Sequence, residues 1–128
     1  MDGGGKLKNW ILVAHPWAWF ASASPAIVAY SYVFYLFKTG AYIGEVNWGY
    51  GILGFIAMLI MHVSGNTMSE YHDFMKGIDV KDKTGPQRLI VKGIFKPKTV
   101  LYYSLTTLAI GSLIGVYLYR YTGFPLLI

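Results

Sequence analysis

Residues 47–65, NWGYGILGFIAMLIMHVSG, and the run that follows at 66–83, NTMSEYHDFMKGIDVKDK, decide the fold of this chain. The first stretch is apolar, and with the small or weakly polar residues up to Met68 it reaches the roughly 20 residues that span hydrocarbon. The second stretch holds four of the chain's six acidic residues. Carboxylates at the end of a span cost free energy unless a partner, a pathway or an ion compensates them. Their position therefore predicts a functional site at the mouth of a membrane helix.

The composition of the whole chain is that of a membrane protein. Among 128 residues, 55% are hydrophobic and only 13% are charged, whereas about 25% are charged in a typical soluble domain. Apart from His15, residues 10–37 carry no charged or imidazole side chain, and residues 100–119 carry none. We predict an all-α membrane protein with one domain, residues 1–128, whose three transmembrane helices lie at about residues 10–37, 47–68 and 98–120.

The basic residues indicate membrane orientation and no nucleic-acid partner. The net charge is +5, but seven of the eleven basic residues lie between Lys76 and Lys98. Three alternating spans place Lys6 and Lys8 on the same side as these residues, and cytoplasmic segments are the ones enriched in Lys and Arg. We therefore expect the loop at 69–97 on the cytoplasmic face of a bacterial or archaeal membrane. The chain has no cysteine, which excludes disulfides and thiolate metal sites.

Prolines and glycines predict where the helices bend or end. Pro16 removes a helical hydrogen bond, so a bend or break is expected near residues 14–16. Gly77 is expected to end the second helix, and Pro97 to begin the third. Gly111 and Gly115 have the spacing that lets another helix approach closely. The apolar residues 124–128 resemble a further span cut short, so we expect this polypeptide to be the front part of something larger.

The acidic run predicts a magnesium-diphosphate site. On a helix, Asn66, Glu70 and Asp73 are four and seven residues apart and share one face, and Asp79 can fold back toward Asp73 beyond Gly77. Mg²⁺ takes one or two carboxylates and fills its octahedron with water and phosphate oxygens. The sequence therefore nominates Glu70, Asp73 and Asp79 as catalytic residues and metal ligands, with Asn66, Lys76 and Arg88 binding the diphosphate.

An alternative interpretation is a charged helix end. In it, the same three carboxylates are solvated at the interface and paired with Lys76, Lys81 or Lys83. Metal ligation by His72 is disfavoured because Mg²⁺ prefers oxygen ligands. His62 is interpreted as a polar wall residue or a buried, hydrogen-bonded histidine, and His15 as a polar group at the interface.

The acidic run also carries a family resemblance. It has the pattern Asn66-x-x-x-Glu70-Tyr71-x-Asp73-x-x-Lys76-Gly77-x-Asp79, followed by Gly85-Pro86-x-Arg88 and Gly93. This pattern resembles the first aspartate-rich motif of the UbiA superfamily of intramembrane prenyltransferases, and its second half is most similar to the 1,4-dihydroxy-2-naphthoate prenyltransferases of menaquinone synthesis. The chain departs from the pattern at Glu70, where aspartate is usual, at Ser69, where many members have asparagine, and at His15, which replaces an arginine.

The resemblance implies a larger helical bundle in which two aspartate-rich motifs face each other across Mg²⁺ and a prenyl diphosphate. The expected reaction joins the prenyl group to an aromatic acceptor in a water-poor cavity. Glu70, Asp73 and Asp79 would fall at acidic motif positions, Asn66 at a polar one, and Lys76 and Arg88 near the phosphates. This sequence contains no second motif. We therefore expect it to be inactive alone and to associate, within membrane lipid, with further helices from another chain or with copies of itself.

Two other functions remain open from the sequence. The chain can be a non-catalytic small subunit of a larger membrane complex that contains quinone or pigment, since its aromatic spans and its glycine pair favour helix packing. It can also be an unrelated three-span protein whose basic loop binds anionic lipid headgroups.

Overall fold

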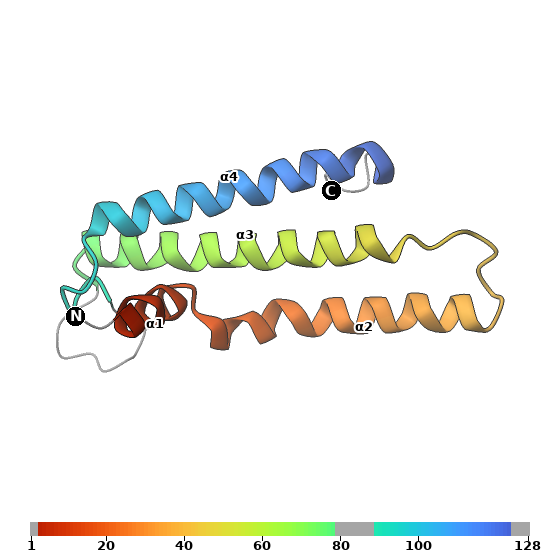
Figure 1. Ribbon diagram of the computed structural model, residues 1–128, viewed down its shortest axis with the longest axis horizontal. Coiled ribbons are helices and arrows are strands. Elements are labelled where there is room, and N and C mark those ends of the chain that lie inside the picture. Colours follow the sequence, from red (N-terminus) through yellow and green to blue (C-terminus); the bar gives the residue numbers. More distant parts are fainter. Residues whose placement is uncertain (1–2, 79–88, 124–128) are drawn as a thin grey trace.

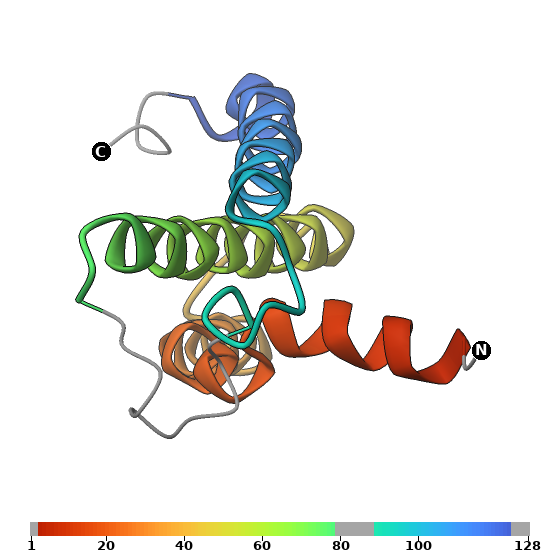
Figure 2. The ribbon, with the colours of Figure 1, turned by 90° about the vertical axis from the view of Figure 1, so that its left-hand side faces the viewer.

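The computed structural model describes residues 3–78 and 89–123, which form four α-helices and one short 3-10 helix. In chain order these are α1 (Gly3–Val13), η1 (Pro16–Ala18), α2 (Trp19–Lys38), α3 (Trp48–Met75) and α4 (Pro97–Thr122). Figure 1 shows α2 and α4 on opposite sides of α3, and α3 packs on both of them. Figure 2 shows that α1 lies crosswise to the other helices, beside the N-terminal end of α2.

Three stretches of helix are long and apolar enough to cross a membrane: residues Gly5–Lys38, Trp48–Met75 and Pro97–Thr122. The predicted fold class, an all-α membrane protein with three transmembrane helices, is confirmed. The helix ends follow from local chemistry. The Asn47 side chain accepts a hydrogen bond from the backbone N–H of Tyr50 and caps α3, while Pro97 occupies the first turn of α4, as predicted.

The expected break near residues 14–16 separates α1 from α2. His15 lies between them in the left-handed region at φ 52 and ψ 56, a conformation that costs a non-glycine residue about 1–2 kcal/mol. The indole N–H of Trp19 donates to the carbonyl oxygen of Ala14 at 2.9 Å and bridges the break. Pro25, by contrast, lies within α2 without ending it.

The end of α3 is a Schellman motif built on Gly77, which confirms the predicted termination. Gly77 has φ +68, the N–H of Ile78 donates to the carbonyl of Asp73 at 3.0 Å, and the N–H of Gly77 donates to that of Phe74 at 3.1 Å. Because α3 continues to Met75, Asn66, Glu70 and Asp73 all belong to the helix.

Small polar residues join α3 to α4. The Ser64 hydroxyl donates to the Ser104 carbonyl at 2.9 Å, and the Ser104 hydroxyl donates to the Ser64 carbonyl at 2.8 Å. Such interhelical bonds hold helices together where no water competes. Gly111 is buried against Met61 and Ala57, so that a Cβ atom there would lie 2.7 Å from the Met61 sulfur, whereas a Cβ at Gly115 would meet nothing within 4 Å.

Replacing Gly111 by leucine is expected to destabilise the α3–α4 pair by about 1–3 kcal/mol, because the added side chain overpacks the contact with Met61. Gly115→Leu is the matched control, since it makes the same change on the same helix in open space. The free energy of unfolding of each variant can be measured by denaturing detergent titration of the purified protein. Equal stabilities of the two variants would contradict this packing.

Candidate functional site

The Glu70 carboxylate is the buried charge around which the end of the bundle is arranged. Glu70 is 7% exposed, and its Oε1 accepts hydrogen bonds from the backbone N–H groups of Leu89 at 2.9 Å and Ile90 at 3.4 Å. Hydrogen bonds to an ionised acceptor are stronger than neutral ones. The carboxylate of α3 thus binds the segment that leads into α4.

The bound segment is itself a tight turn. The N–H groups of Ile94 and Phe95 both donate to the carbonyl of Leu89, at 2.9 and 3.2 Å, and that of Gly93 donates to Ile90 at 2.9 Å. Its side chains complete a small apolar core in which Val13, Leu89, Ile90 and Val100 are buried. The carboxylate therefore receives its hydrogen bonds at the edge of an apolar cluster, where burying it without them would be costly.

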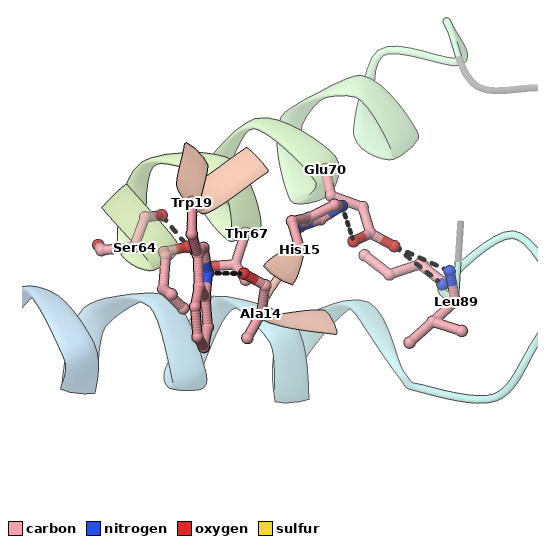
Figure 3. Close-up of polar contacts among 9 residues, drawn as sticks. Ala14, His15, Trp19, Ser64, Thr67, Glu70 and Leu89 are labelled. Carbon is pink, nitrogen blue, oxygen red and sulfur yellow. Dashed lines mark hydrogen bonds and ion pairs between the residues drawn. The ribbon is translucent and has the colours of Figure 1, made fainter. Parts of the chain in front are cut away.

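His15 approaches the same carboxylate from the break between α1 and α2. Its Nε2 lies 3.7 Å from Oε2 of Glu70, a contact that becomes an ion pair when the imidazole is protonated. His15 is 9% exposed, so the residue expected at the interface is buried in the fold. Figure 3 shows Glu70 reaching from α3 between His15 and Leu89. One side chain thus joins three segments that are distant in sequence.

A polar ladder continues from Glu70 toward the middle of α3. Asn66 lies one turn before Glu70, and His62 one turn before Asn66; both are partly buried. Nδ1 of His62 is 2.6 Å from the Ser22 hydroxyl of α2, so the expectation of a hydrogen-bonded histidine is confirmed. Within residues 3–78 and 89–123, Nε2 of His62 and Nδ2 of Asn66 are buried and have no hydrogen-bond partner. These two atoms can serve a ligand or further helices.

Asp73 lies one turn beyond Glu70 and is differently placed. It is half-buried, and in the described part of the chain no hydrogen bond or ion pair of its carboxylate is found. Lys76 follows as the exposed C-cap of α3. The C-terminal end of α3 therefore presents an available carboxylate, Asp73, and a cation, Lys76, next to the Glu70 carboxylate that is already engaged.

The structure brings together part of the predicted site. Asn66, Glu70, Asp73 and Lys76 lie along the last turns of α3, whereas Asp79 and Arg88 lie outside the described residues. No group of three or more His, Asp or Glu side chains close enough to hold a metal occurs among the residues described. The alternative of a solvated charged helix end does not fit Glu70, because that side chain is buried.

Sequence reasoning missed three partners in this site. Leu89 and Ile90 bind the carboxylate through their backbone N–H groups, which cannot be recognised from the residue type. Ser22 is one of many small residues in an apolar helix, and its contact with His62 bridges residues 40 apart in the chain. Glu70, where the resembling motif has aspartate, was the one feature of the sequence that could have indicated the contact with Leu89 and Ile90. Its side chain is one methylene longer than that of aspartate and can therefore extend to a neighbouring segment.

The fold and this buried polar ladder define a helical membrane protein with a candidate ligand site at one end of its central helix. No family model and no solved structure matches the chain significantly. Known proteins nevertheless match it. It is 29% identical over 119 residues to the zebrafish (Danio rerio) UbiA prenyltransferase domain-containing protein 1, a match that covers 93% of this chain and 33% of the relative.

Bacterial relatives show the same similarity. The chain is 37% identical over 71 residues to the 1,4-dihydroxy-2-naphthoate octaprenyltransferase of Bacillus subtilis, with 52% of this chain and 23% of the relative covered. For the enzyme of that name from Mycobacterium tuberculosis the identity is 28% over 102 residues, covering 78% of this chain and 35% of the relative. The resemblance to the UbiA superfamily is confirmed as a similarity of sequence, and the chain spans about a third of the length of these proteins or less.

Removing the Glu70 carboxylate is expected to destabilise the fold. In Glu70→Ala the buried N–H groups of Leu89 and Ile90 lose their acceptor, at a cost of about 1–3 kcal/mol for each group left unsatisfied. Glu45→Ala removes an exposed carboxylate from the connection between α2 and α3 and is the control. Thermal unfolding in detergent, followed by circular dichroism, measures both. A Glu70→Ala variant as stable as the control would show that the carboxylate does not hold the turn.

Proposed function

We propose that this chain contributes the first metal and diphosphate site of a UbiA-type prenyltransferase. The observation that carries the proposal concerns three side chains near the end of α3. The Glu70 carboxylate accepts a hydrogen bond from the backbone of Leu89. The Asp73 carboxylate and the Asn66 amide nitrogen, on the same helix, have no hydrogen-bond partner among the described residues and can bind a ligand. The relatives support the reaction class, because each is named as a UbiA-domain protein or a prenyltransferase.

In the proposed site, the Asp73 carboxylate suits a magnesium ion of the kind that accompanies a diphosphate. Mg²⁺ uses one or two carboxylates and leaves its other positions to water and phosphate. In this proposal Asp73 is one ligand and Asp79 the other. Glu70 acts as a positioning residue, because its Oε1 is already shared by two backbone N–H groups. Bound Mg²⁺ would supply charge neutralisation for the departing diphosphate.

The chain's own residues would bind and orient the diphosphate. The amide of Asn66 donates a hydrogen bond through the Nδ2 group that has no partner in the described protein. Lys76, exposed at the end of α3, and Arg88 contribute positive charge. The apolar core beside Glu70 limits the access of water to this end of the site.

The finer assignment rests on the names of the bacterial relatives. We propose an allylic prenyl diphosphate as donor and an aromatic acceptor such as 1,4-dihydroxy-2-naphthoate, in menaquinone biosynthesis. The site would face the cytoplasm of a bacterial or archaeal cell, since α1 and the start of α4 lie at the same end of the bundle (Figure 1) and carry the exposed lysines Lys6, Lys8, Lys96 and Lys98. Further membrane helices, from another chain or from a second copy, would complete the cavity.

Asp73→Asn tests the proposal most simply. Isothermal titration of the protein in detergent with farnesyl diphosphate is expected to show binding that requires Mg²⁺ and that weakens about tenfold or more in the variant, since the lost charged contact is worth about 1.5–3 kcal/mol. Glu45→Gln, which neutralises an exposed carboxylate between α2 and α3, is expected to bind as the parent does. Binding that is indifferent to Mg²⁺, or equal in the two variants, would remove the metal site from the proposal.

A further inference from the structure

An apolar groove lies beside the candidate site, under the crosswise helix α1. Its volume is about 470 Å³, within the range of small-molecule sites. α1 contributes Ile11, α3 contributes Ile56, Ile60 and Val63, and α4 contributes Tyr103 and Thr107. The groove is set among helices that are apolar enough to span a membrane. Its chemistry therefore suits a hydrocarbon chain.

The groove adjoins a second hollow, to whose lining two polar residues contribute. This hollow has a volume of about 220 Å³ and is lined by Lys6, Asn9, Trp10, Ile94 and Phe95. Trp10 lines both spaces, and its ring lies 4.6 Å from that of Phe95 and 5.2 Å from that of Tyr103. A lysine and an asparagine thus line the smaller hollow, and Trp10 connects it to the apolar groove.

We propose that the two hollows together bind one anionic phospholipid, with an acyl chain in the groove and the phosphate beside Lys6 and Asn9. Charge complementarity supports this occupant, because basic residues near a membrane surface attract anionic lipid. Exposed lysines are carried by α1 and the start of α4, which lie at the same end of the protein (Figure 1): Lys6, Lys8, Lys96 and Lys98. The crosswise course of α1 in Figure 2 is that of a helix lying in the interface, where indole rings such as Trp10 reside.

The lipid site is distinct from the proposed diphosphate site. Ile56, Ile60 and Val63 form one stripe of α3, whereas His62, Asn66 and Asp73 form another, roughly a quarter of a turn around the helix at 100° per residue. Ala14 lines the groove, while the next residue, His15, lies against Glu70. A lipid in the groove therefore packs on the outer side of the break between α1 and α2 and leaves the polar ladder accessible.

Tryptophan quenching by brominated lipids tests this proposal. Two of the four tryptophans, Trp10 and Trp19, line the groove, so the other two are replaced by phenylalanine and the protein is reconstituted in phosphatidylcholine vesicles. Brominated phosphatidylglycerol, added as a small fraction of the lipid, is expected to quench saturably. Brominated phosphatidylcholine at the same fraction is expected to quench only as dilute bulk lipid does.

Two matched pairs of variants locate the lipid. Lys6→Gln is expected to raise the half-saturating fraction of phosphatidylglycerol about fivefold, and Lys6→Arg to restore it. Lys8→Gln, at an exposed lysine outside the hollow, is expected to raise it clearly less. Ile56→Phe, which fills the groove, is expected to lower the plateau of quenching. Ile52→Phe, at an exposed position outside the groove, is expected to keep it.

Three results would overturn the proposal. Equal quenching by the two brominated lipids would mean contact with bulk lipid only. Equal effects within a matched pair would move the lipid away from these hollows. Displacement of the bound lipid by farnesyl diphosphate with Mg²⁺ at stoichiometric amounts would assign the groove to the prenyl chain of the substrate.

Discussion

The fold of this protein depends on the hydrogen bonds that one buried carboxylate accepts. Glu70 lies near the end of a membrane-spanning helix, where an unsatisfied charge is costly, and it is satisfied by the backbone of a turn 19 and 20 residues further along the chain. His15, from the break between α1 and α2, approaches the same group. One side chain therefore joins the break before α2, the last turns of α3 and the segment that leads into α4.

This arrangement divides the acidic segment into two kinds of carboxylate. Glu70 faces the apolar core of Val13, Leu89, Ile90 and Val100 and is engaged by the protein. Asp73, one turn later, has no such partner in the part of the chain described. The division explains how a motif of closely spaced acids can both build the end of a bundle and keep a carboxylate available for the proposed ligand. It also explains why an acid one methylene longer than aspartate is accommodated at position 70.

Local chemistry was sufficient to predict much of the fold. The lengths of the apolar runs indicated three membrane helices, Pro16 the break before α2, and Gly77 the end of α3, because each effect acts within a few residues. The partners of Glu70 could not be predicted, since Leu89 and Ile90 act through backbone groups that every residue type except proline carries. The spacing of Gly111 and Gly115 predicted that both could contact another helix, yet of the two only Gly111 packs against α3. The face that a helix turns to its neighbour depends on tertiary packing, which this spacing does not determine.

Backbone hydrogen exchange at Leu89 and Ile90, in protein reconstituted into lipid nanodiscs, tests the central claim most directly. Both amides should exchange slowly in the parent protein because the Glu70 carboxylate accepts their hydrogen bonds. In Glu70→Ala the exchange of these two amides should accelerate strongly, while amides in the middle of α4 keep their protection. Rapid exchange at Leu89 and Ile90 in the parent protein, or protection that survives the substitution, would contradict the account.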